Sequence, residues 1–295
     1  MRQDRYCVAG HALSIRYEKE DEESLLDNFN NFRIATDDAR RDTFCMNVVE
    51  NIDKWDSNAH SVGVFDCGGN DYDVSRREDG TYQFIIYNPQ KEICVKMTAD
   101  EDFRNSHVMF IAPDTSNRRF GLNNSMMLAY SFALCGEGTL LVHSSVIRHA
   151  GKAYMMTAPS GTGKSTHTYL WYKNIPDCDL MNDDNPIIRM VDGRAIVYGS
   201  PWSGKTPCYR NIEAPIGGIV RIKQSPDNKI RRLPPIEAFT TMLSACNNMK
   251  WDKRVYTSVC TTLSELVAAT RLWELECRPD KEAAIVCHDA VTQDS

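Results

Sequence analysis

The chain has 295 residues, of which 42% are hydrophobic and 25% are charged, and its formal net charge is -6. This length predicts two domains or one large one, and the composition excludes a wholly disordered or fibrous chain. The acidic balance argues against binding to nucleic acid or to an anionic membrane, because such proteins carry a basic surplus or a basic stripe.

The sequence predicts no membrane span and no secretory signal. Its longest apolar stretch, from about Met126 to Val142, is interrupted by Ser131 and by residues 136–138, and it falls short of the ~20 residues that a membrane helix needs. The N-terminus lacks a continuous apolar segment. The eleven cysteines include no C-x-x-C pair, which argues against a zinc ribbon and indicates free thiols in a reducing compartment. We therefore expect a cytoplasmic protein.

Residues 1–115 are expected to form an N-terminal α+β or β-rich unit that carries no catalytic motif. Short strand-like runs alternate there with polar, acidic connections. Residues 81–88 predict a strand that leaves a tight turn, because Asp79-Gly80 supplies the positive φ that such turns need. The boundary is expected between Pro113 and Asn123, where Asp, Ser, Asn and Gly cluster.

Residues 116–295 predict a mixed α/β domain. The expected strands lie at 139–147, 153–158, 178–183, 214–225 and 271–277, with a hairpin at 186–200 that turns at Asp192-Gly193. The expected helices lie at 125–135, 165–174, 235–248, 261–270 and 280–291. This order of strands and helices is typical of a mixed α/β core, here followed by C-terminal helices.

A phosphate-loop motif lies between the strand at 153–158 and the helix at 165–174. Residues 158–166 read APSGTGKST and match G-x-x-x-x-G-K-[ST], except that Ala158 replaces the first glycine. In such a loop, glycines let backbone N–H groups turn toward phosphate oxygens, the lysine reaches the outer phosphates and the serine hydroxyl binds Mg²⁺. The alternative is a glycine-rich turn without a ligand. The motif predicts a nucleoside triphosphate or another polyphosphate with Mg²⁺, held by Ser160, Gly161, Thr162, Gly163, Lys164, Ser165 and Thr166.

An acidic pair, Asp183-Asp184, is expected to return to this loop. The helix at 165–174 carries the chain ~15 Å away from the phosphates, and the strand at 178–183 brings it ~20 Å back. Adjacent strand residues point to opposite faces, so both carboxylates reach one site only if the strand ends there, which Pro186 favours. We expect one Asp to support the metal together with Ser165 and the other to act as a base or as an orienting group, and the sequence leaves open which does which. The alternative is an acidic turn.

The ordered set of motifs resembles the HPr kinase/phosphorylase superfamily, which is related to phosphoenolpyruvate carboxykinase. The resemblance covers about residues 123–290 and is closest to an HPr-kinase-like branch that includes peptide kinases. It rests on HSS at 143–145, the phosphate loop, NDD at 182–184, GSPWSGK at 199–205, the strand at 214–224 and CRPD at 277–280.

The resemblance implies a mixed-sheet P-loop core of the HPr kinase/phosphoenolpyruvate carboxykinase type that phosphorylates a seryl hydroxyl. It also implies catalytic roles for Lys164, Asp183 and Asp184, a homo-oligomer and, in some members, reverse phosphorolysis. By resemblance, His143 would lie near the acidic pair and tune it, whereas the alternative is a core histidine. The residues that recognise HPr are not identifiable in this chain, so HPr is not carried over as the substrate.

A second glycine-bearing loop, residues 199–205, is expected to form a mobile cover. Lys205 would reach a phosphate and Trp202 would stack on a base or substrate. The alternative is an ordinary hairpin connection. Arg210 is expected to add positive charge at the transferred phosphoryl group.

Together these motifs predict an ATP- and Mg²⁺-dependent kinase that acts on a hydroxyl, with a serine of a protein or peptide as the expected acceptor. Two alternatives remain open. One is a small-molecule kinase on the same fold. The other is a nucleotide-sensing or peptide-binding module with little turnover, which the replacement of the first loop glycine by Ala158 and the unassigned N-terminal unit would favour.

Overall fold

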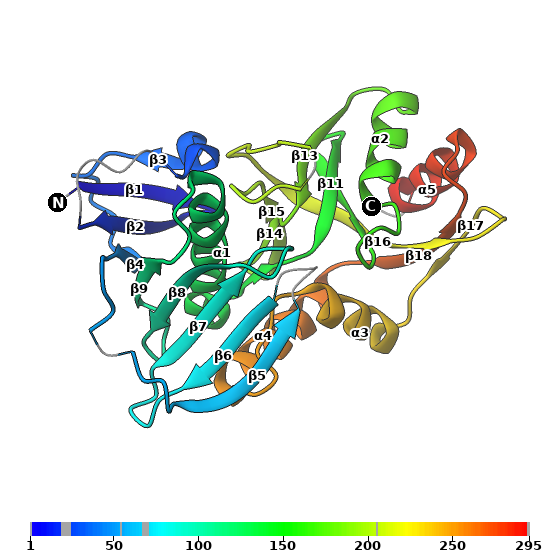
Figure 1. The fold of residues 1–295 in the computed structure, drawn as a ribbon. Coiled ribbons are helices and arrows are strands. Elements are labelled where there is room, and N and C mark those ends of the chain that lie inside the picture. Colours follow the sequence, from blue (N-terminus) through cyan, green and yellow to red (C-terminus); the bar gives the residue numbers. More distant parts are fainter. Residues whose placement is uncertain (1, 19–24, 54, 67–70, 205, 294–295) are drawn as a thin grey trace. The chain divides into compact units, whose positions relative to one another are not determined.

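The computed structural model describes residues 2–18, 25–53, 55–66, 71–204 and 206–293. The chain divides into two compact units, Met1–Leu134 and Cys135–Ser295. The fold is mixed α/β, with one large mixed sheet in each unit and a few helices (Figure 1).

In the first unit, nine strands of the described residues form one sheet in the order β3-β1-β2-β4-β9-β8-β7-β6-β5. The pairs β2–β4 and β4–β9 are parallel and the others are antiparallel. The strands are β1 (Arg2–Val8), β2 (His11–Tyr17), β3 (Arg33–Ile34), β4 (Asp42–Val48), β5 (His60–Asp66), β6 (Asp71–Arg76), β7 (Tyr82–Tyr87), β8 (Ile93–Ala99) and β9 (Asn105–Phe110), and a short 3-10 helix, η1 (Asp27–Phe32), precedes β3.

The helix α1 (Thr115–Ala133) packs on this sheet against β4, β7, β8 and β9. It begins ten residues before the expected helix at 125–135, because the Asp114 carboxylate accepts a hydrogen bond from the Asn117 amide and caps the first turn. Gly121 lets the helix approach β8, since a Cβ there would lie 2.4 Å from Val95 Cγ1. The unit therefore ends at Leu134, whereas the sequence places the boundary at 115.

In the second unit, seven strands of the described residues follow the order β10-β14-β15-β16-β12-β11-β13. In addition, β18 pairs with β16, and β17 pairs with β18. The central pairs β12–β16 and β16–β18 are parallel, and β11 pairs antiparallel with both β12 and β13. The strands are β10 (Thr139–Leu141), β11 (Ser144–His149), β12 (Lys152–Thr157), β13 (Cys178–Asp184), β14 (Ile187–Val191), β15 (Arg194–Tyr198), β16 (Glu213–Gln224), β17 (Lys229–Arg232) and β18 (Leu272–Cys277).

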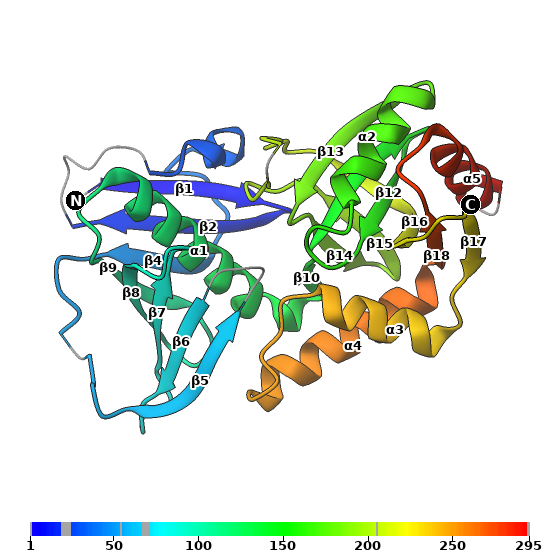
Figure 2. The ribbon, with the colours of Figure 1, turned by 45° about the vertical axis from the view of Figure 1, so that its right-hand side comes forward.

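Helices cover this second sheet in two pairs. The helix α2 (Lys164–Asn174) packs beside α5 (Lys281–Gln293), and α3 (Pro235–Ala245) packs beside α4 (Lys253–Ala269), as Figure 2 shows; η2 (Cys135–Glu137) is a 3-10 turn. The core under α2 and α5 includes Tyr154, Trp171 and Trp273, all less than 5% exposed. These large side chains hold α2, and with it the preceding glycine-rich loop, against the sheet.

The strand expected at 139–147 is two strands in the structure. β10 pairs with β14, whereas β11 pairs with β12 and β13. Between them, the Val142 amide donates to Pro186 O at 3.1 Å and the His143 amide donates to Ala245 O at 2.7 Å. His143 therefore lies at a break between two strands, where its backbone amide bonds to the C-terminal end of α3.

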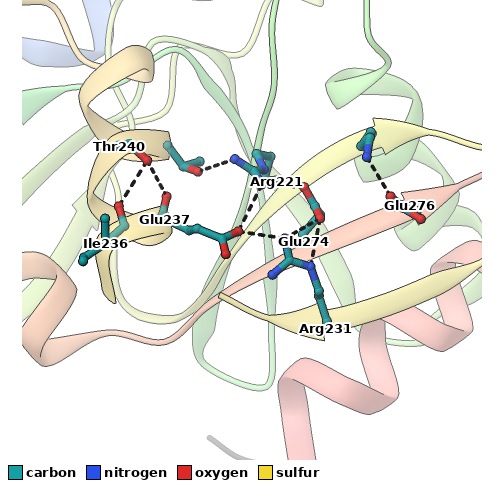
Figure 3. Close-up of polar contacts among 9 residues, drawn as sticks. Arg221, Arg231, Ile236, Glu237, Thr240, Glu274 and Glu276 are labelled. Atoms are coloured by element: carbon teal, nitrogen blue, oxygen red, sulfur yellow. Dashed lines mark hydrogen bonds and ion pairs between the residues drawn. The ribbon is translucent and has the colours of Figure 1, made fainter. Parts of the chain in front are cut away.

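Figure 3 shows a charged network that joins β16, β17, β18 and α3. Arg221 and Arg231 lie on either side of Glu274 and donate to its carboxylate at 2.5 Å and 2.8–3.0 Å. Arg231 also donates to Glu237 of α3 at 2.7 Å. Burial alone would raise the pKa of Glu274, but the hydrogen bonds from the two arginines outweigh it and lower that pKa. The network ties the last strands and α3 to the centre of the sheet.

Candidate functional site

The parallel strands of the second unit end at one edge of the sheet. β12 ends at Thr157, β16 at Gln224 and β18 at Cys277, and each is followed by a loop at this edge. Ligands of open α/β sheets bind outside the carboxyl ends of parallel strands. The glycine-rich loop at 158–163 leaves the first of these ends.

The backbone of this loop has the left-handed turns that its glycines permit. Gly161 has a φ of 78° and Gly163 a φ of 116°, while Ala158 does not adopt a positive φ, so the loss of the first glycine strains nothing. α2 begins at Lys164 with no side chain capping its first turn. Its N-terminal amides, which carry the positive end of the helix dipole, are therefore not capped by a side chain of the protein. The Ser160, Ser165 and Thr166 side chains are exposed here.

Both carboxylates of the acidic pair return to this edge. β13 ends at Asp184, which satisfies the condition that the strand stop there. Asp183 is opposite Ser145 in the β11–β13 register, and the Ser145 hydroxyl lies 2.9 Å from the Thr168 hydroxyl of α2. Because directly opposed residues share a face, Asp183 lies on the α2 face of the sheet. Asp183 is buried and Asp184 is half-buried.

His143 lies beside this pair, as the resemblance implied. Its Nε2 is 3.3 Å from Asp184 Oδ1. Burial, and to a lesser extent the Lys164 ammonium, lowers the pKa of His143 to about 4. The imidazole is therefore neutral at pH 7 and polarises Asp184 without forming an ion pair with it.

Lys164 is buried at the start of α2. Its ammonium donates to Ala158 O at 3.0 Å. Burial lowers the pKa of Lys164, while Asp184 and Asp183 act to raise it. Burial also raises the pKa of Asp184, an effect that Lys164 opposes and Asp183 reinforces. One ammonium, two carboxylates and one neutral imidazole thus share a poorly solvated edge of the sheet.

The second glycine-bearing loop is packed against the acidic strand and does not form an open cover. The side-chain amide of Asn182 donates to Ser200 Oγ at 3.2 Å and to Trp202 O at 3.2 Å. The Gly204 amide donates to Asp183 O at 2.6 Å. Trp202 is 6% exposed, so its ring is not free to stack on a ligand, contrary to the sequence-based expectation. Lys205 lies outside the described residues.

Arg210 is placed at the other end of β13. Its guanidinium donates to Asp179 Oδ2 at 2.6 Å and to Leu180 O, and Asp179 is also held by Arg148 at 2.9 Å. Asp179 precedes Asp183 by four strand residues, which corresponds to about 13 Å. Arg210 therefore supports the start of the strand and does not reach the phosphoryl site that the sequence suggested for it.

A cleft of 520 Å³ lies next to the glycine-rich loop. Gln224 and Arg278, which the sequence-based site omitted, line it from the ends of β16 and β18. Gln224 Nε2 donates to Thr162 O at 3.1 Å and so fixes the loop from this side. The parallel order of the strands is the signal that would have identified both residues. The other lining residues are Gly161, Thr162, Gly163, Thr166, His167, Leu170, Ile222, Ser225, Cys277 and Pro279.

The described residues contain no group of three or more His, Cys, Asp and Glu side chains arranged to hold a metal ion. A magnesium ion at the acidic pair would therefore depend on phosphate oxygens and water for the rest of its ligands, which is its usual mode of binding. Within the described part of the chain, no helix is long and apolar enough to cross a membrane.

Comparisons with known proteins give only distant structural similarities. No protein family model matches the sequence, and no curated protein matches it. The structure is similar to that of the HPr(Ser) kinase/phosphatase from Coxiella burnetii, with a TM-score of 0.32 and 9% sequence identity over 52% of this chain and 89% of that chain. A similarity this distant carries no argument about fold or function, so the chemistry is argued from the side chains of this chain.

Proposed function

We propose that the second unit is an ATP- and Mg²⁺-dependent phosphotransferase that acts on a hydroxyl group. The observation that carries this proposal is the convergence of Lys164, Asp183, Asp184 and His143 beside an uncapped helix N-terminus. A glycine-rich turn without a ligand would not require a buried lysine facing two carboxylates, because burying such charges costs free energy.

The triphosphate would be held by residues 158–166. Backbone amides at the start of α2 suit phosphate oxygens, and the Lys164 ammonium adds a charge that is already desolvated. The adjoining 520 Å³ cleft has room for the nucleoside. Its lining by Gln224 and Arg278 supplies polar groups next to the loop.

The metal would be held by the Ser165 hydroxyl and the Asp183 carboxylate, with water between where needed. Ser165 is exposed at the start of α2, and Asp183 lies on the α2 face of the sheet. When bound, Mg²⁺ neutralises charge that develops on the transferred phosphoryl group.

Asp184 is the group that we assign to accept the proton of the attacking hydroxyl. Its raised pKa makes it a better base than an ordinary aspartate, and its half-exposed position leaves it accessible to a substrate. Neutral His143 at 3.3 Å holds and polarises the carboxylate. We assign a serine of a protein or peptide as the acceptor, by resemblance.

Transfer of label from ATP marked on its γ-phosphate tests this function. We expect labelled product with a peptide pool, and a loss of about 100-fold to 1,000-fold in Lys164→Ala, because one charge that stabilises the transition state is removed. Asp184→Asn should keep nucleotide binding and lose transfer. Lys173→Ala, an exposed lysine in the last turn of the same helix, is the matched control and should retain activity.

Two outcomes would contradict parts of the proposal. Transfer that survives in Lys164→Ala would exclude the phosphate loop as the site. Label found only on small hydroxyl compounds of a metabolite pool would retain the kinase and replace the peptide acceptor with a small molecule.

A further inference from the structure

Two histidines that the proposed phosphotransfer does not use face each other on the second unit. His149 ends β11 and His288 lies in α5, the helix that packs beside α2. Their Nε2 atoms are 3.4 Å apart, and their ring planes meet at 72°. The His288 ring also packs on Trp171, with centroids 5.4 Å apart. Both side chains are half-buried, so small solutes can reach them.

The other nitrogen of each ring shows where the protons are. His149 Nδ1 lies 3.1 Å from Pro176 O, and a carbonyl oxygen can only accept, so Nδ1 carries the proton. His288 Nδ1 lies 3.0 Å from Asp289 Oδ1, and the carboxylate likewise requires a proton on Nδ1. In two neutral imidazoles, both Nε2 atoms then present lone pairs to each other. Such a pair needs a cation between the rings.

The distance between the rings favours a metal ion over a shared proton. Two nitrogens that bind one tetrahedral zinc ion at about 2.0–2.1 Å are about 3.3–3.4 Å apart. A shared proton would draw the nitrogens closer, because hydrogen bonds of this kind have heavy-atom distances near 2.9 Å. The outer contacts agree, since metal-binding histidines usually donate their second N–H to a carboxylate or a backbone carbonyl.

We propose that His149 and His288 form a binding site for a divalent transition-metal ion such as Zn²⁺. Both Nε2 atoms are the ligands, and water occupies the remaining positions, because the described residues supply no third side chain to such a group. Asp289 and the Pro176 carbonyl orient the two rings. The ion would link the end of β11 to α5. It would thereby stabilise the packing of the C-terminal helix on the β11–β12 hairpin, which is followed by the glycine-rich loop. This proposal is independent of the phosphotransfer.

Zinc titration of the full chain tests the site. We expect wild type to bind one more Zn²⁺ than His149→Phe or His288→Phe, with the ring signals of His149 and His288 shifting in histidine side-chain NMR spectra and the melting temperature rising with Zn²⁺. Phenylalanine keeps the ring packing on Trp171 in the second variant. Asp289→Ala should weaken binding about 10-fold to 100-fold, because it removes the partner that orients His288.

The control variant is His107→Phe, which removes an exposed histidine of the first unit and should leave the zinc site intact. Zinc bound by cysteine thiols is common to all of these proteins, so the difference between variants isolates the histidine pair. Equal zinc binding by wild type and both histidine variants, with unshifted ring signals, would overturn the proposal and leave a shared proton as the cation.

Discussion

At the scale of single residues, protonation decides what the candidate site can do. Burial dominates the pKa shifts of His143, Lys164 and Asp184, and each shift favours the uncharged form. His143 is neutral while it lies 3.3 Å from a carboxylate, although a histidine beside an aspartate is ordinarily expected to gain a proton. The neighbouring Lys164 ammonium explains part of this, because it repels a second positive charge.

The first prediction concerns the proton on His143. An NMR titration of the histidine ring should give a pKa of about 4. In Lys164→Met this pKa should rise, because a positive charge is removed, but it should stay below 6.5 because burial is the larger cause. A His143 titration at or above 6.5 in wild type would contradict the burial argument.

The same shift has a consequence for stability. A histidine whose pKa is depressed in the folded state binds its proton more readily when unfolded, so stability falls as the pH drops from 6.5 toward 4. Above pH 6.5 this contribution is absent. Urea unfolding at pH 7.5 and pH 5 should show a smaller pH effect in His143→Gln than in wild type.

At the scale of elements, the site is made by strand direction. Antiparallel β11 and β13 bring His143 and the acidic pair to the edge where β12 delivers the glycine-rich loop. Parallel β16 and β18 bring Gln224 and the segment after Cys277 to the same edge. The Arg221–Glu274–Arg231 network holds the outer strands in this register (Figure 3).

The second prediction compares two glutamates of β18. Glu274→Ala should reduce the free energy of unfolding by about 1–3 kcal/mol, because it leaves two arginines without their shared acceptor. Glu276, also on β18, forms an exposed ion pair with Lys223 of β16, and Glu276→Ala should cost less than about 1 kcal/mol. Urea unfolding at neutral pH measures both.

The loss of stability caused by Glu274→Ala depends on pH, and the sign of this dependence follows from the pKa of Glu274. Since the pKa of Glu274 is lowered in the fold, its contribution is complete above the ordinary value of 4.5 and is lost as the pH falls below it. The difference in the free energy of unfolding between wild type and Glu274→Ala should therefore become smaller in acid. A larger loss for Glu276→Ala than for Glu274→Ala would show that the network is not the stabilising element.

At the scale of the whole molecule, each unit has its own sheet and its own helical cover. Eleven of the nineteen residues of α1 are buried, and the helix packs on β4, β7, β8 and β9 of the first sheet. The helix expected at 125–135 is therefore the second half of α1. It belongs to the first unit, whereas the sequence-based prediction placed it in the second domain.

The third prediction tests this boundary. A fragment of residues 1–134 should unfold cooperatively, whereas a fragment of residues 1–114 should not, because the sheet face under α1 would be exposed to water. Circular dichroism during heating measures both. Cooperative unfolding of the shorter fragment would place the boundary near residue 115 after all.

Local pattern predicted most elements of the second unit. The strand ending at Thr157, the helix after Gly163, the strand ending at the acidic pair and the hairpin at Asp192-Gly193 all agree with the structure, because each is marked by hydrophobic pattern and by turn residues within its own segment. The short strand β17 was missed because its sequence, KIRR, has no apolar alternation. It forms through its pairing with β18.

The sequence alone determined which chemical groups were available: a glycine-rich turn with its lysine, and a carboxylate pair one helix and one strand later. These follow from residue identity and spacing, which are local. Only the tertiary structure decided that His143 stands at a strand break beside Asp184, that Arg210 turns to Asp179, that Trp202 is buried and that His149 meets His288. These positions depend on which strands pair and which helices pack together. The free energy of such pairing and packing comes from contacts between residues far apart in the chain.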